Sequence, residues 1–161
     1  MLSIEEIKKQ YPSDIHKFER GLLREYLQFL ILEIIFSSNI STKLSFLGGT
    51  CLRIVCGIKR FSEDLDFDNK ELSSKEFTSL AKRIEQELQR QGFDVEIKLT
   101  EKKAIHCHVK FSNILFENRL SDIKTEKIDI QIDTFDQGYE YESDLYLLNK
   151  FNVFKQIRVT P

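Results

Sequence analysis

The sequence has no tryptophan, only three cysteines and no excess of either charge. The odd number and the spacing of Cys51, Cys56 and Cys107 fit neither a disulfide framework nor a zinc site. We expect all three to be small buried apolar residues, as suits a reducing cytoplasm. The formal net charge of -2 gives no global reason to expect nucleic-acid binding, so only a local basic face would serve that purpose.

The chain also lacks a long hydrophobic run and a targeting segment. Its longest apolar run, FLILEIIF at residues 29–36, is interrupted by Glu33 and is too short to span a bilayer. The N-terminus is acidic and amphipathic and carries no signal-peptide pattern. These absences predict a cytoplasmic protein without a membrane partner.

The composition is that of a globular domain, with 41% hydrophobic and 31% charged residues in 161 positions. A chain of this length buries a core without disulfides or metals, and we expect one domain spanning residues 1–161. Ser3 and Glu6 form a capping box for a short helix that Pro12 ends. A second helix is expected from residue 13 or 14 to about residue 36, and its wide apolar face predicts substantial burial.

The rest of the sequence carries alternating strand and helix signals. A short helix is expected to end near Gly57, and a longer helix begins at the capping box of Ser73 and Glu76 and ends at Gly92. Strands are expected at KLSFLGG, LDFD, DVEIKLT, AIHCHVKF and EKIDIQIDTF, with one or two more in the tail. This order predicts an α/β or α+β fold, in which helices flank a mixed β-sheet and N-terminal helices come first.

Two glycines and a threonine lie between the first expected strand and the short helix. Gly48 and Gly49 allow the backbone to turn tightly and to approach a bulky ligand, while free N–H groups at a helix start favour an anion. The Thr50 hydroxyl would add a phosphate contact. Such turns also occur for purely structural reasons, so both interpretations stay open for this segment alone.

Alternating carboxylates follow in the segment DLDFD. On a strand, Asp64 and Asp66 project to the same side, and adjacent carboxylates repel unless a cation neutralises them. Mg²⁺ prefers oxygen ligands of this kind. Asp68 continues the row, and Asp129 would add a third carboxylate if its strand lies beside this one, with Asp133 as the competitor on the same face. A solvent-exposed sheet edge would show the same D-x-D pattern.

Cationic side chains lie between the glycines and the carboxylates. Arg60 and Ser62 come just before the carboxylates, where a polyphosphate carrying Mg²⁺ needs positive charge and hydroxyl groups. Arg53 either points at the same phosphates or is a solvated surface arginine. His106 and His108 alternate on the outer face of an expected strand, where solvated side chains are favoured over metal ligands.

In combination, LGGTCLRIVCGIKRFSEDLDF resembles the nucleotidyltransferase motif of the DNA-polymerase-beta-like superfamily, and specifically the AbiEii/AbiGii toxin family. The match covers residues 46–67 and reaches Asp129 through KIDI. The resemblance implies a nucleotidyltransferase fold and transfer of a nucleotide from a nucleoside triphosphate to an acceptor, with Mg²⁺ or Mn²⁺ as cofactor. Some relatives modify tRNA ends, which makes RNA a candidate acceptor, and others are described as binding GTP. It also implies a toxin with a cognate antitoxin, often in phage defence.

The resemblance implies roles for individual residues. Asp64, Asp66 and Asp129 would be catalytic and would hold the metal. Phosphates would be bound by Gly48, Gly49, Thr50 and Ser62, and the leaving pyrophosphate would be neutralised by Arg53 and Arg60. Candidate contacts of an RNA acceptor are Arg119, Lys124 and Lys127, whereas the pairs Lys8-Lys9 and Lys102-Lys103 are expected to be solvated surface.

Two features depart from the wider pattern. Fourteen residues separate Gly49 from Asp64, slightly more than in much of the superfamily. Family members usually continue into a helical C-terminal region, which we expect to be missing because this sequence stops at Pro161. The alternative function is therefore a non-catalytic nucleotide-binding or interaction module that acts through antitoxin or RNA binding.

Overall fold

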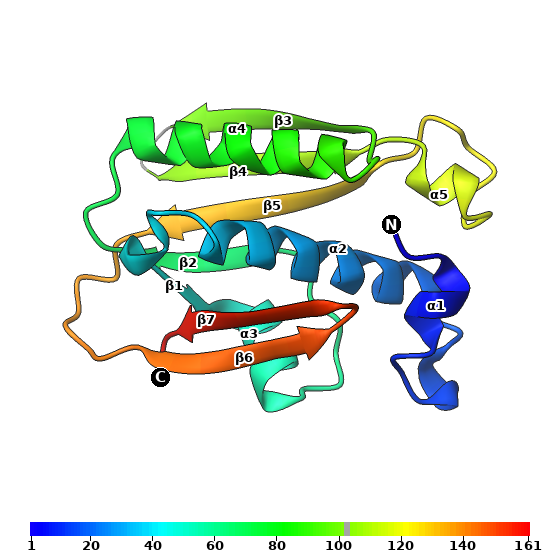
Figure 1. Cartoon of the computed structure of the whole chain (residues 1–161), viewed down its shortest axis with the longest axis horizontal. Coiled ribbons are helices and arrows are strands. Elements are labelled where there is room, and N and C mark those ends of the chain that lie inside the picture. The colour runs from blue at the N-terminus through cyan, green and yellow to red at the C-terminus, as the bar shows by residue number, and fades with distance from the viewer. Residues whose placement is uncertain (102–103) are drawn as a thin grey trace.

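A computed structural model of the chain describes residues 1–101 and 104–161, so the expectation for Lys102 and Lys103 lies outside the described residues (Figure 1). The helices are α1 (Ile4–Lys8), α2 (Glu19–Phe36), α3 (Gly48–Cys56), α4 (Ser74–Arg90) and α5 (Ile114–Glu117), with 3-10 turns at Ser13–Ile15 and Ser41–Lys43. The strands are β1 (Leu44–Leu47), β2 (Leu65–Asn69), β3 (Val95–Glu101), β4 (Ile105–Phe111), β5 (Ile128–Phe135), β6 (Asp144–Lys150) and β7 (Val153–Val159).

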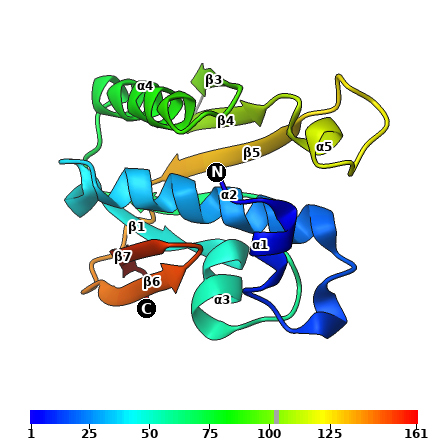
Figure 2. The ribbon, with the colours of Figure 1, turned by 45° about the vertical axis from the view of Figure 1, so that its right-hand side comes forward.

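Within the described residues the strands form one seven-stranded sheet in the order β3-β4-β5-β2-β1-β7-β6. The sheet is mixed, because β2 pairs in parallel with β5 and β1 with β7, whereas the other neighbouring pairs are antiparallel. Helices α2 and α4 cover one face of this sheet (Figure 2). The predicted mixed sheet flanked by helices is confirmed.

Helix α2 packs across the middle of the sheet and is buried over most of its length. The rings of Phe36 on α2 and Phe46 on β1 both pack against Phe67 on β2, with centroids 6.1 and 5.4 Å from it. The predicted burial is confirmed, but the helix begins at Glu19, later than expected. Phe18 leaves the helical conformation, with ψ at 51°, and its ring packs on Phe61.

Local signals fix most of the other elements. Both predicted capping boxes are present, at Ser3 and at Ser73, and Gly57 and Gly92 follow their helices with positive φ angles. The apolar face of β5 is buried as its alternation predicts. Helix α5 was not expected, and the tail forms two strands. In the described ranges, no helix is both long enough and apolar enough to cross a membrane.

The cysteines follow the prediction only in part. Cys51 and Cys107 are buried, and burial raises the pKa of their thiols to about 11 and about 12. The prediction was wrong for Cys56, which is exposed. Cys56 is the last residue of α3, and Gly57 turns the chain away from the core directly after it.

Candidate active site

The parallel pairing of β2 with β5 brings two carboxylates side by side. Asp66 on β2 lies directly opposite Asp133 on β5, and Asp64 comes just before the start of β2. The Asp133 side chain is 17% exposed and its Oδ1 atom accepts a hydrogen bond from Gln131 (2.8 Å) and contacts His106 Nδ1 on β4. The expected convergence of a later strand on the D-x-D strand therefore occurs, with Asp133 at the meeting point.

Asp129 lies on the same face of β5 but further from Asp66. It lies four positions before Asp133, about 13 Å along a strand. Its register neighbour on β4 is Lys110, and its carboxylate contacts Nδ1 of His108 at 3.0 Å. Its side chain is 42% exposed. The geometry favours Asp133 over Asp129 as the third carboxylate.

The clustered carboxylates affect one another. Burial raises the pKa of Asp66 above its usual value, and the charges of Asp133 and Asp64 raise it further. Burial also raises the pKa of Asp64, followed by the charges of Asp133 and Glu63. Arg24 opposes this rise, and the charge of Asp129 adds a smaller contribution to it. The group as a whole therefore favours a bound proton or cation.

The two glycines at the start of α3 make room for this group. Gly48 has a φ of +84°, and a Cβ added there would lie 2.5 Å from Oδ2 of Asp66. A Cβ added to Gly49 would lie 3.0 Å from Oγ of Ser62. The Asp66 and Ser62 side chains therefore lie close to the glycine backbone, next to the first N–H groups of α3. An anion would be stabilised at these N–H groups.

An open cleft of about 730 Å³ adjoins these residues. Its lining includes Gly49, Arg60, Ser62, Asp64 and Asp66. Arg60 is exposed on the loop between α3 and β2. The structure thus brings together five of the residues expected to bind phosphate or metal.

Thr50 and Arg53 bind backbone carbonyls instead of lining the cleft. The Thr50 hydroxyl is buried and donates to the backbone carbonyl of Asp64. The Arg53 side chain is 12% exposed, donates from Nε to Glu25 (2.7 Å), and donates from Nη1 to the carbonyls of Ile58 and Lys59 (2.8 and 2.9 Å). Both residues therefore fix the backbone around the cleft and do not point into it.

Two buried polar residues of α2 complete this support and were missed from the sequence. Gln28 donates from Nε2 to the carbonyls of Ser62 (2.9 Å) and Glu63 (3.0 Å). Glu25 accepts from Arg53 and also from the Tyr11 hydroxyl (2.6 Å). Both are at most 4% exposed. A carboxylate and an amide three residues apart in the buried part of α2 were the available signal.

Asp68 continues the row of carboxylates but belongs to the scaffold. It is 1% exposed, accepts from the backbone N–H of Gln137 (2.9 Å), and accepts from the Tyr141 hydroxyl. Its carboxylate holds the segment between β5 and β6 against the end of β2. It is therefore not available as a metal ligand.

The donor set fits a magnesium ion shared with a substrate better than a protein-only metal cage. Among residues 1–101 and 104–161, no three histidine, cysteine or acidic side chains are close enough to hold a metal by themselves. Mg²⁺ is commonly held by one or two carboxylates together with substrate phosphates and water. Asp64 and Asp66 supply such a pair at the edge of the cleft, with raised pKa values that a cation would offset.

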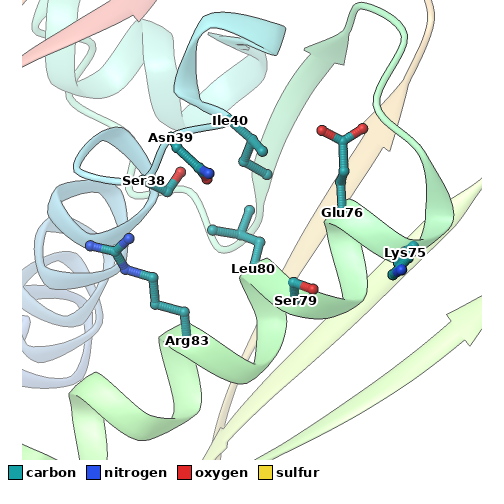
Figure 3. A pocket seen from close by; sticks show the side chains of 8 residues that line it. All are labelled: Ser38, Asn39, Ile40, Lys75, Glu76, Ser79, Leu80 and Arg83. Atoms are coloured by element: carbon teal, nitrogen blue, oxygen red, sulfur yellow. The ribbon is translucent and has the colours of Figure 1, made fainter.

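A second hollow, of about 320 Å³, lies between the end of α2 and α4 (Figure 3). Its polar groups have structural tasks, since Glu76 caps α4 and pairs with Lys43 (2.9 Å), and Arg83 donates to the carbonyl of Ser37. In Figure 3 no second carboxylate accompanies Glu76 among the lining side chains. This hollow does not share the chemistry of the cleft.

Comparison with known proteins agrees with this geometry. The family model described as "Nucleotidyl transferase AbiEii toxin, Type IV TA system" matches residues 30–151. The chain belongs to the AbiEii nucleotidyltransferase toxin family. The match includes the glycine turn, the carboxylates of β2 and all of β5. No curated protein is similar enough to the chain to count as a relative.

Two solved structures share the fold. One is JHP933 from Helicobacter pylori, with a TM-score of 0.58 and 19% identity, covering 89% of this chain and 53% of that one. The other, a candidate nucleotidyltransferase from H. pylori, has a TM-score of 0.60 and 18% identity, covering 89% of this chain and 54% of that one. The AbiEii chain described here thus spans about half the length of these two proteins.

Proposed function

We propose that this AbiEii domain transfers a nucleotide from a nucleoside triphosphate to an acceptor hydroxyl, with RNA such as tRNA as the acceptor. In this proposal it is the toxin of a toxin–antitoxin pair that acts in phage defence. The observation that carries the proposal is Asp66 beside Asp133, packed against the Gly48 turn at the edge of an open cleft. Donor phosphates and metal-binding carboxylates need this adjacency.

The residues divide the chemistry between them. Asp64 and Asp66 would hold Mg²⁺ or Mn²⁺, which supplies charge neutralisation for the triphosphate and the reacting oxygens. The N–H groups at Gly48 and Gly49, with Ser62 and Arg60, bind and orient the phosphates.

Asp133 is the candidate general base. Its Oδ1 atom takes the contacts from His106 and Gln131, while Oδ2 has no hydrogen bond within the described residues. The acceptor oxygen attacks the α-phosphorus, the bond to the β-phosphate oxygen breaks, and pyrophosphate leaves. Asp133 accepts the hydroxyl proton. Thr50 and Arg53 position the surrounding backbone.

Label transfer tests the proposal. The chain is incubated with Mg²⁺, total RNA and each α-labelled nucleoside triphosphate, and RNA-bound label is measured. Asp133→Asn should lower transfer by about 100-fold or more, whereas Asp129→Asn should stay within a few-fold of wild type. These two variants form a matched pair, because each aspartate contacts a histidine of β4. If Asp129→Asn lowered transfer more than Asp133→Asn, Asp129 would be the third carboxylate of the site.

Nucleotide binding gives a second measurement. Titration calorimetry with Mg²⁺ and nucleoside triphosphate should show metal-dependent binding that Asp64→Ala and Asp66→Ala abolish. Metal-dependent binding as tight as that of wild type in both variants would remove the metal assignment.

The alternative, a non-catalytic module that acts through antitoxin or RNA binding, is favoured by the half-length match to the two solved structures. Transfer by the 161-residue chain would reject it. Metal-dependent nucleotide binding without transfer would support it.

A further inference from the structure

Another cavity, of about 310 Å³, adjoins the nucleotide cleft and is distinct from the hollow of Figure 3. The segment Phe61-Ser62-Glu63 lines both spaces and therefore forms a wall between them. On the far side of the wall the lining includes Gly21 and Arg24 of α2, with Ile128 of β5. Asp64, the first carboxylate of the site, follows directly at the end of the wall.

The wall is held firmly from α2. Gln28 binds the carbonyls of Ser62 and Glu63, as described above. A Cβ added to Gly21 would lie 3.1 Å from the Phe61 ring, so the missing side chain lets the ring pack directly on the helix. The Arg53 guanidinium also packs over the Phe61 ring, 4.1 Å from its centroid.

In the part of the chain that the structure describes, Arg24 is the one cationic side chain lining this cavity that has no ion-pair partner. Among the described residues, Arg20 is paired with Glu126 (2.5 Å) and Lys127 with Glu96 (2.9 Å). Arg24 instead donates from Nη1 to the backbone carbonyl of Asp129 at 2.7 Å, a neutral partner. Its remaining N–H groups are thus available to an anion, while its charge also lowers the pKa of the nearby Asp64. A planar guanidinium binds phosphate oxygens in pairs.

We propose that this cavity binds a phosphate of the acceptor nucleic acid, with Arg24 as its ligand. Donor and acceptor then lie on opposite sides of the wall at 61–63 and meet at Asp64, Asp66 and Asp133. Phe61 and Ile128 offer apolar surface for the adjoining sugar or base. This inference rests on the proposed transferase function, because it names the acceptor subsite of that reaction.

Fluorescence anisotropy tests the subsite with a 5′-fluorescein single-stranded RNA of about 12 nucleotides. Arg24→Met should weaken RNA binding roughly 10-fold and reduce the slope of log affinity against log salt by about 1. Arg24→Lys should bind RNA with intermediate affinity, because lysine keeps the positive charge but lacks the paired N–H donors of the planar guanidinium. The matched control is Arg90→Met, which removes an exposed arginine from the end of α4 and should bind like wild type.

A variant that removes a negative charge should tighten RNA binding, which partial unfolding would not do. Glu63→Gln removes an exposed carboxylate from the wall and should tighten RNA binding. The inference is overturned if Arg24→Met and Arg90→Met bind RNA equally, or if inorganic phosphate displaces the RNA at equal concentration, which would indicate a free-anion site. It is also overturned if Arg24→Met loses nucleoside triphosphate binding to the same extent as RNA binding.

Failure of the transferase proposal would look different. In that case wild type transfers no label, while the RNA affinity still depends on Arg24. The subsite would then stand as an RNA-binding site of a non-catalytic module.

Discussion

At the residue scale, Asp66 is packed closely against other groups of the candidate site. Its carboxylate lies against the Gly48 turn and next to Asp133 on the adjacent strand β5. Both burial and the neighbouring charges raise its pKa. In the metal-free protein at neutral pH, the ionised form of this group therefore opposes folding. The opposition is absent at low pH, where the group is protonated, and is fully present above its raised pKa.

Asp66→Asn should accordingly stabilise the metal-free protein at pH 7. A gain of about 1 kcal/mol corresponds to a rise of about 2–4 °C in Tm for a chain of this size. The gain should shrink as the pH falls, since the wild-type carboxyl is then neutral as well. Thermal unfolding in chelator, followed by circular dichroism at several pH values, measures both effects.

Asp122→Asn is the control for this measurement, because Asp122 is exposed on a loop. It should leave Tm unchanged. A lower Tm for Asp66→Asn than for wild type would show that the carboxylate stabilises the fold, contrary to this expectation.

At the scale of elements, α2 supports the loop between α3 and β2. Gln28 binds two carbonyls of that loop, and Glu25 binds it through Arg53. Burial of both side chains makes these bonds costly to lose, because an unpaired buried carbonyl has no water to replace its partner. The helix thus fixes the wall that carries Ser62.

Gln28→Met should cost about 1–3 kcal/mol of stability, because it leaves the Ser62 and Glu63 carbonyls unpaired. It should also weaken nucleotide binding by about tenfold, ~1.4 kcal/mol, since Ser62 loses its support. Chemical unfolding and calorimetry measure the two quantities.

Gln89→Met provides the comparison, because Gln89 likewise donates from Nε2 to one backbone carbonyl, that of Val95 (3.2 Å), on the distant helix α4. Because the Gln89 side chain is exposed, this change should alter stability by about 0.5 kcal/mol or less and leave nucleotide affinity unchanged. Equal nucleotide affinities for the two variants would show that Gln28 has no positioning role.

Most elements could be predicted from the sequence because their signals are local. The capping boxes at Ser3 and Ser73 and the period-two pattern of β5 depend only on near neighbours along the chain. The register between strands is not local. A strand pattern places Asp129 and Asp133 on one face alike, and only the pairing of β5 with β2 brings Asp133 opposite Asp66.

Dependence on contacts between distant segments also limited the prediction of individual site residues. The glycine turn and the D-x-D pair were recognisable from order and spacing. The inward partners of Thr50 and Arg53 depend on Asp64 and on α2, which approach only in the folded chain. The family pattern identified these residues but did not distinguish ligand contact from support of the backbone.

At the scale of the whole molecule, one end of the sheet presents apolar side chains to solvent. Leu145 and Leu147 of β6 and Phe154 of β7 lie on one face of the terminal hairpin, and Phe154 is 70% exposed. In the described residues β6 has β7 as its one neighbour in the sheet, so it is also an edge strand. Apolar edges of this kind favour self-association.

Replacing Leu147 and Phe154 together by lysine should therefore reduce light scattering of concentrated samples, because charged edge residues oppose strand pairing. Tm should change by about 1 °C or less, as both side chains face solvent. Ile123→Lys, which replaces an isolated exposed apolar residue, should leave scattering unchanged. Identical scattering from all proteins would contradict the expectation.

The position of β5 between β4 and β2 has a consequence for how the protein is made. A ribosome delivers Asp64 and Asp66 well before Asp133, which comes 67 positions after Asp66. A nascent chain, or a fragment cut ahead of residue 128, carries the recognisable motif without the completed site. Under the function proposed above, this strand order postpones transferase activity until β5 has been synthesised.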